Sequence, residues 1–155
     1  MKKILVAVFL IQAVLSCKQI DVFEKNTTMK NYKWKSSIPA TGSFNISDTS
    51  SLYDIYITLR HTDAYEFNNI WLQIGLKNPD DTMRFQKVDL QLGNDQNGWE
   101  GTGMNDIWEV RKKLNDQPLQ FKKQGVYNFE IKQIMRTDPL NNIMSAGLRL
   151  EKRKQ

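Results

Sequence analysis

The chain has little of the two residue types that build metal centres and disulfide frameworks, with one Cys and one His among 155 residues. A disulfide needs a second Cys, and a zinc site made only of Cys and His needs four such ligands, so we expect neither. Gly 8 and Pro 4 are too few for a collagen-like or linker-dominated chain. No metal or cofactor is expected, and a Ser–His–Asp or Cys–His catalytic arrangement would depend on the single His61.

The composition is that of one folded domain. Of the residues, 40% are hydrophobic and 10% aromatic, which is enough to build a core. The formal net charge is only +5 despite the basic tail Lys152–Lys154. This mild charge indicates a solvated surface and does not favour nucleic acid as a partner.

The first residues have the pattern of a targeting signal. Lys2 and Lys3 precede the apolar stretch Ile4–Leu15, which would be about 18 Å long as a helix. A bilayer core is about 30 Å thick, so the stretch is too short for a stable span and is typical of a signal peptide.

The next residues, Val14–Cys17, resemble a bacterial lipobox. A branched residue lies three positions before the Cys, and the small Ser16 lets a peptidase approach the bond. Cys17 would then carry a thioether-linked diacylglycerol and an acylated amine, and two or three acyl chains anchor a protein almost permanently. The expected organisation is a signal peptide over 1–16, a lipidated Cys17 and tether over 17–30, and one domain over 31–155.

Alternation of apolar and polar residues dominates the rest of the chain and predicts β-strands. The inward faces are expected at Tyr53, Ile55, Ile57 and Leu59; Ile70, Leu72, Ile74 and Leu76; Tyr127, Phe129, Ile131 and Met135; and Ala146, Leu148 and Leu150. About eight short strands with polar turns predict an all-β fold, a single antiparallel β-sandwich, with a small β-barrel as the alternative.

Two segments are less regular. The apolar phase changes between Met83–Phe85 and Val88–Leu92, which predicts a β-bulge at Gln86–Lys87. The segment Ile107–Leu114 has helical spacing over a short window and is open between a helical turn and a strand.

No segment matches a catalytic or ligand-binding motif closely. The glycine-rich segment Gly98–Asp106 fits neither a phosphate-binding loop nor a calcium loop, and a strand connection in which Trp99 caps the core is the simpler interpretation. His61 with Asp63 could form a general base, although a lone His at a strand end is usually an ordinary hydrogen-bonded residue. No motif places a nucleophile beside it, and nothing selects a carboxylate pair for glycoside hydrolysis.

The four tryptophans allow a sugar-stacking or a packing interpretation. Trp71 lies on the opposite strand face to Ile70 and Leu72, so it faces solvent or covers a second packing surface. The candidate interaction surface comprises Trp71, Trp99, Gly101, Gly103, Asp106 and Arg136.

Several blocks along the chain resemble one known family. They are Leu59-Arg60 through Asp63 with Tyr65, Phe67 and Asn69; Trp99 to Gly103 with Asp106-Ile107; Gly125 to Phe129 with Gln133, Met135 and Arg136; and Gly147 to Arg149. With the lipobox at Cys17, their order and spacing are similar to the gliding-motility lipoprotein GldH family of Bacteroidota. The resemblance implies an envelope lipoprotein associated with the gliding apparatus, without a known catalytic site.

Two functions remain open at this point. The leading hypothesis is a lipid-anchored, non-enzymatic structural or assembly subunit that binds other envelope or motility proteins. The alternative is a glycan-binding envelope lipoprotein with an exposed Trp, and no small-molecule substrate is evident for either. Cys17 is followed by Lys18 and Gln19 and not by an acidic run, which favours the periplasmic leaflet of the outer membrane over the cell surface.

Overall fold

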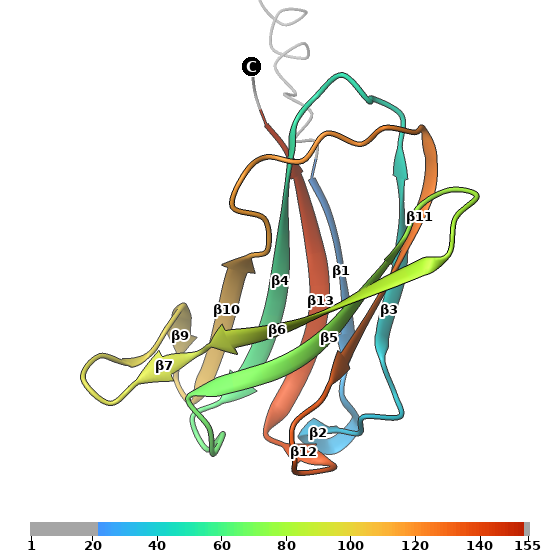
Figure 1. Cartoon of the computed structure of the whole chain (residues 1–155). Helices are drawn as coiled ribbons and strands as arrows, with labels where there is room; N and C mark the ends of the chain where they lie inside the picture. Colours follow the sequence, from blue (N-terminus) through green and yellow to red (C-terminus); the bar gives the residue numbers. More distant parts are fainter. Residues whose placement is uncertain (1–21, 154–155) are drawn as a thin grey trace, which may run out of the picture.

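The computed structural model describes residues 22–153, which form two antiparallel β-sheets packed face to face (Figure 1). The five-stranded sheet has the order β1 (Val22–Thr28), β13 (Ile143–Lys152), β4 (Tyr53–Thr62), β10 (Ile107–Lys113) and β9 (Thr102–Met104). The four-stranded sheet has the order β3 (Ala40–Ile46), β11 (Gly125–Gln133), β5 (Asn69–Lys77) and β6 (Met83–Gln91). Both sheets are open, so the predicted β-sandwich is confirmed.

Short elements complete the described chain. They are the 3-10 helix η2 (Lys30–Tyr32), the pair β2 (Lys33–Trp34) and β12 (Leu140–Asn141), and the pair β7 (Gly93–Asn94) and β8 (Gly98–Trp99). Within residues 22–153, no helix has the length and hydrophobicity that crossing a membrane requires.

The core lies between the sheets and is built from the alternating faces that the sequence predicts. Ile57, Leu72, Ile131 and Leu148 are among its fully buried members. Burying a side chain of this size contributes about 1.5–3 kcal/mol each. Trp34 is also completely buried, and its indole N–H donates to the carbonyl of Ile38 at 2.9 Å.

Part of the expected tether is a strand. Residues 17–21 lie outside the described residues, but Val22–Thr28 forms β1, which pairs with β13 over its whole length. The sequence does not show the alternation expected of a strand here, because Phe23 is the one large side chain of β1 that packs against the core. Its outward residues Glu24 and Asn26 are instead held by polar contacts with the neighbouring strands.

The predicted bulge at Gln86–Lys87 is wrong. β5 and β6 pair in continuous register from Asn69 opposite Gln91 to Lys77 opposite Met83. The apolar phase changes because Met83 and Phe85 face outward, where Phe85 lies opposite Gly75. A Cβ at Gly75 would be 2.6 Å from the Phe85 ring, so the aromatic side chain occupies the space that the glycine leaves empty.

The ambiguous segment Ile107–Leu114 contains strand β10, which pairs with β4 on one side and β9 on the other. Val110 points into the core, while Glu109 and Arg111 face outward and form ion pairs. The apolar residues have helical spacing, but pairing with the two neighbouring strands determines the secondary structure of this short segment.

Candidate interaction surface

The sandwich has two distinct ends (Figure 1). We call the end that holds the start of β1, the end of β13 and loops 47–52 and 114–124 the terminal end, since both ends of the described chain lie there. The distal end is opposite and holds loops 63–68 and 134–139 and the starts of β5 and β10.

An aromatic cluster fills the distal end between the two sheets. The rings of His61 and Trp99 are 4.6 Å apart in an edge-to-face arrangement, and Tyr65 packs between Trp99 and Phe67. The Tyr65 hydroxyl donates to the carbonyl of Asn69 at 3.0 Å. Trp99 is half-buried against the core, which agrees with the expectation that it caps one end.

Backbone contacts hold loop 63–68 over this cluster. The Asp63 N–H donates to the carbonyl of Asp106 at 2.8 Å, and the Asn142 side chain donates to the carbonyl of Ala64 at 2.8 Å. The candidate residue Asp106 thus contributes its main chain to the distal end, while its side chain remains exposed.

A groove of about 350 Å³ opens beside the aromatic cluster and brings together Trp71 and Arg136. Its lining also includes Phe67, Asn69, Ile134, Met135 and Thr137. Trp71 is 43% exposed, and its backbone N–H points to the Met135 sulfur at 3.2 Å. An exposed indole face next to a guanidinium suits an aromatic or acidic side chain of a partner, because both groups make direct contacts with such side chains.

The buried Gln133 fixes the loop that carries Arg136. Its amide N–H donates to Asp138 at 3.2 Å, and its carbonyl accepts from the Met135 N–H at 2.8 Å. Asp138 also accepts hydrogen bonds from the hydroxyl and the backbone N–H of Ser36, and these bonds lower the pKa of its carboxyl. The groove wall is therefore preorganised.

The candidate glycines Gly101 and Gly103 have packing roles. Gly101 has a φ of +94°, and a Cβ there would collide with the backbone oxygen of Glu109. Gly103 lies under the Trp108 ring, which would be 2.8 Å from a Cβ. Both glycines let β9 and the residue before it lie close to β10, and neither glycine lines the groove.

The tryptophans do not form a row of exposed rings. Trp34 is buried, Trp99 and Trp108 are half-buried, and Trp71 is the exposed one of the four. A platform for adjacent sugar units needs at least two such rings, and the tryptophans of the described chain supply one exposed ring, that of Trp71.

His61 is fully buried and faces the rings of Trp99 and Tyr65. Its Nδ1 lies 2.8 Å from the carbonyl of Thr62, and within the described chain its Nε2 has no hydrogen-bond partner. Burial lowers the pKa of His61 and outweighs the effect of the Thr62 carbonyl. In residues 22–153, no group of three or more His, Cys, Asp or Glu side chains is placed to hold a metal ion.

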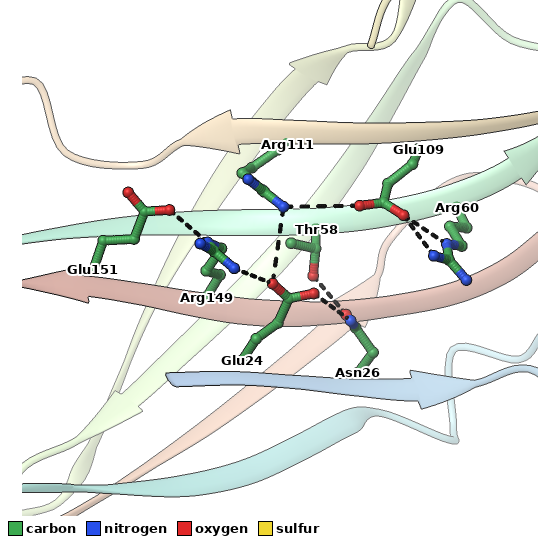
Figure 2. Close-up of polar contacts among 8 residues, drawn as sticks. All are labelled: Glu24, Asn26, Thr58, Arg60, Glu109, Arg111, Arg149 and Glu151. Carbon is green, nitrogen blue, oxygen red and sulfur yellow. Dashed lines mark hydrogen bonds and ion pairs between the residues drawn. The ribbon is translucent and has the colours of Figure 1, made fainter. Parts of the chain in front are cut away.

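A charged network that sequence reasoning missed covers the outer face of the five-stranded sheet (Figure 2). Arg149 donates to Glu24 at 2.8 Å and to Glu151 at 2.5 Å, and Arg60 contacts Glu109 at 2.7 Å. Two longer ion pairs of 3.9 Å and 3.8 Å link Arg111 to Glu24 and to Glu109. The alternation of β4 and β10 indicates outward charges, but only the strand register places opposite signs side by side.

The network centres on Glu24 of the edge strand. Burial raises the pKa of the Glu24 carboxyl, but hydrogen bonds from Arg149 and Asn26 outweigh it, and the pKa lies below its ordinary value. Beside it, the Thr58 hydroxyl donates to Asn26 at 2.5 Å. The three arginines and three glutamates balance one another, so this face presents little net charge to a partner.

The blocks that carry the family resemblance gather mainly at the distal end. His61, Tyr65, Phe67 and Trp99 make ring contacts, and Asn69, Met135 and Arg136 line the groove. The blocks Gly125–Phe129 and Gly147–Arg149 lie instead within β11 and β13.

Comparisons with known proteins agree with the sequence resemblance. A family model described as GldH lipoprotein matches residues 21–150. Two similar proteins are a gliding motility lipoprotein GldH from Flavobacterium johnsoniae, 26% identical over 94% of this chain and 95% of its own length, and a gliding motility lipoprotein GldH homolog from Christiangramia forsetii, 22% identical over 96% and 94%. Among solved structures, a chain of the infectious bursal disease virus Gt strain aligns with 84% of this chain and 30% of its own, at 15% identity and a TM-score of 0.35.

Proposed function

The chain belongs to the GldH lipoprotein family, and from this premise we propose that it is a non-enzymatic subunit of a gliding apparatus that binds other envelope proteins through its distal end. The family is one of lipid-anchored envelope proteins. The absence of catalysis is supported by His61, whose imidazole packs under Trp99, out of reach of a substrate.

The proposed anchor is a diacylglyceryl group on Cys17, with the signal peptide removed before it. Cys17 is the single cysteine of the chain and follows the apolar stretch at the position that lipid attachment requires. We place the protein on the periplasmic leaflet of the outer membrane, because Lys18 and Gln19 follow the cysteine in place of an acidic run.

The observation that carries the proposed binding role is the groove at the distal end. It joins Trp71 and Arg136, which are 65 positions apart in the sequence, and the surrounding blocks are those that resemble the family. An exposed aromatic beside an arginine is the composition of protein–protein hot spots. We therefore propose that a partner inserts an apolar or acidic segment here.

The test is complementation of a gene deletion in the native host. The variant Trp71→Ala with Arg136→Glu is expected to fold and reach the membrane at normal abundance but to leave the deletion phenotype in place. A matched control, Phe85→Ala with Arg84→Glu, also removes an exposed aromatic side chain and reverses the charge of an exposed arginine, here on β6 outside the groove, and is expected to complement. Full complementation by the groove variant would refute the binding role.

The anchor is tested in the same strain with Cys17→Ala. We expect this variant to be released from the membrane fraction and to fail to complement. If an unanchored protein restores full function, lipid attachment is not needed and the proposal of a membrane-tethered subunit is wrong.

A further inference from the structure

The terminal end of the sandwich is a rigid surface made of two loops that are bonded to each other. The side chains of Gln120 and Gln124 donate to the carbonyls of Thr49 and Ser47, both at 2.8 Å. Tyr53 and Leu119 exchange two backbone hydrogen bonds of 2.8 Å. Loops 47–52 and 114–124 therefore hold their side chains in fixed positions.

An aromatic cluster supports this surface from inside. Phe121 projects from loop 114–124 onto Tyr53, Phe44 and Tyr127, at ring distances of 5.2, 5.8 and 4.8 Å. Phe44 and Tyr127 stack nearly parallel at 5.6 Å. The ring of Phe121 therefore attaches loop 114–124 to the hydrophobic core.

Two leucines on this packed surface nevertheless face outward. Leu52 is 43% exposed and Leu119 is 36% exposed. Leu119 pairs with Tyr53, so these two side chains share one face, and Leu52, one position before Tyr53, points to the other face. Each leucine therefore adds exposed apolar surface to the terminal end, one on either face of the paired backbone.

Most charged groups around the leucines form ion pairs, and two exposed lysines form no ion pair closer than 4 Å within the described chain. Asp48 is bonded to Lys152, and Asp54 forms ion pairs with Lys113 and Arg153. The next residues of the loop, Lys122 and Lys123, are exposed, and Asp116 is the exposed acid of the same loop. Asp80 and Asp81 of the β5–β6 turn line the same hollow as the two lysines; Asp81 forms an ion pair with Arg84, and the charge of Lys123 contributes to lowering the pKa of Asp81.

The position of this surface relative to the proposed anchor limits what can cover it. β1 starts at Val22 at the terminal end, and the chain from Cys17 to Val22 spans at most about 18 Å even when fully extended. If Cys17 carries the lipid, as proposed above, the leucines and the lysine pair are held close to the headgroups of the same leaflet.

We propose that the terminal end binds the phospholipid leaflet directly, with Leu52 and Leu119 in the interfacial layer and Lys122 and Lys123 on anionic headgroup phosphates. Interfacial binding combines buried apolar area with attraction of basic residues to anionic lipid. The contact orients the sandwich upright and points the Trp71–Arg136 groove away from the membrane.

The test uses the full lipidated protein in vesicles of phosphatidylethanolamine, with and without phosphatidylglycerol and with a spin-labelled lipid as quencher. Because Cys17 is capped by lipid, an introduced Cys is the single free thiol and takes a fluorophore. One probe is Gln117→Cys in the terminal loop, and its partner is Glu66→Cys in the distal loop; both positions are exposed. We expect quenching at 117 that increases with phosphatidylglycerol, and none at 66.

The lysine contribution is tested by charge reversal. Lys122→Glu with Lys123→Glu is expected to abolish the increase with phosphatidylglycerol. The matched control, Lys33→Glu with Lys35→Glu, makes the same charge change near the distal end and is expected to keep it. Equal responses of the two double variants would overturn the headgroup contact.

The outcomes separate this inference from the proposed function. Anchored protein with no quenching at 117 overturns the membrane contact and leaves the anchor intact. Protein that labels at two thiols and does not co-float with vesicles has no lipid on Cys17. That result overturns both the proposed anchor and the membrane contact.

Discussion

At the residue scale, individual glycines and the side chains that cover them determine how closely neighbouring strands pack. Phe85 fills the space above Gly75, and Asn26 covers Gly147 on the opposite sheet. These arrangements depend on which residues lie opposite each other across strands. Alternation along the chain predicts which residues point inward, but it does not give cross-strand register.

Gly147 is the clearest case for a mutation. It is buried in the middle of β13, and a Cβ there would collide with the backbone oxygen of Lys25 on β1. Because backbone cannot rotate away, Gly147→Ala is expected to lower the free energy of unfolding by about 2 kcal/mol. Urea unfolding of the variant measures this.

A suitable control is Gly98→Ala. Gly98 has open space around its Cβ position and a φ of +71°, so alanine there costs only the backbone strain of about 1 kcal/mol. A Gly147 variant as stable as the wild type would show that β1 does not approach β13 as described.

The single His61 predicts a defined pH dependence. Burial lowers its pKa in the folded state below the unfolded value of 6.5, so the unfolded chain takes up the proton first as the pH falls. Stability is then complete above pH 6.5 and decreases as the pH drops below it. The free energy of unfolding, measured on both sides of this value, is expected to fall on the acidic side.

The variant His61→Leu tests whether His61 causes this loss of stability, because the chain contains no other histidine. In this variant the free energy of unfolding is expected to stay constant just below pH 6.5. It should still fall at lower pH, where carboxyls such as Glu24 become protonated. An unchanged profile in the variant would mean that His61 is not the titrating group.

At the element scale, regular strands were predictable and irregular ones were not. β4, β5 and the part of β13 from Ala146 to Leu150 alternate regularly, so their inward faces could be read directly from the sequence. The register shift between Ile143 and Ser145 at the start of β13 could not. β1 could not, because most of its residues are polar and its stability comes from pairing with β13. The groove likewise requires that β11 lie beside β5, a pairing of distant segments that local patterns do not specify.

The edge strand β1 should depend on its ion pairs. Glu24→Gln removes the charge that Arg149 and Arg111 contact, and it is expected to destabilise the protein by about 0.5–1 kcal/mol, since these partly exposed pairs are screened by solvent. Hydrogen exchange of the β1 amides should increase more than that of the β11 amides.

The control is Asp81→Asn, which breaks the more exposed ion pair with Arg84 and should leave β1 unchanged. The lowered pKa of Glu24 adds a second expectation. Its stabilising effect is present above its ordinary pKa of 4.5 and is lost as the pH falls below it. Equal exchange at β1 in the wild type and in Glu24→Gln would contradict the role of the network.

At the scale of the whole molecule, the two ends of the sandwich have different compositions. The end of the sandwich at which β1 starts carries the exposed leucines and lysines of its loops, and the distal end carries the groove and most of the family blocks. The two proposals assign a different role to each end: the terminal end contacts the leaflet, and the distal end binds a partner protein.

The lipid on Cys17 is the central claim, and mass spectrometry of the mature amino terminus from the native host tests it most directly. We predict a first peptide that begins at Cys17 and carries a diacylglyceryl thioether, with an acylated amine. A peptide that begins upstream of Cys17, or one with a free thiol at that residue, would contradict the account.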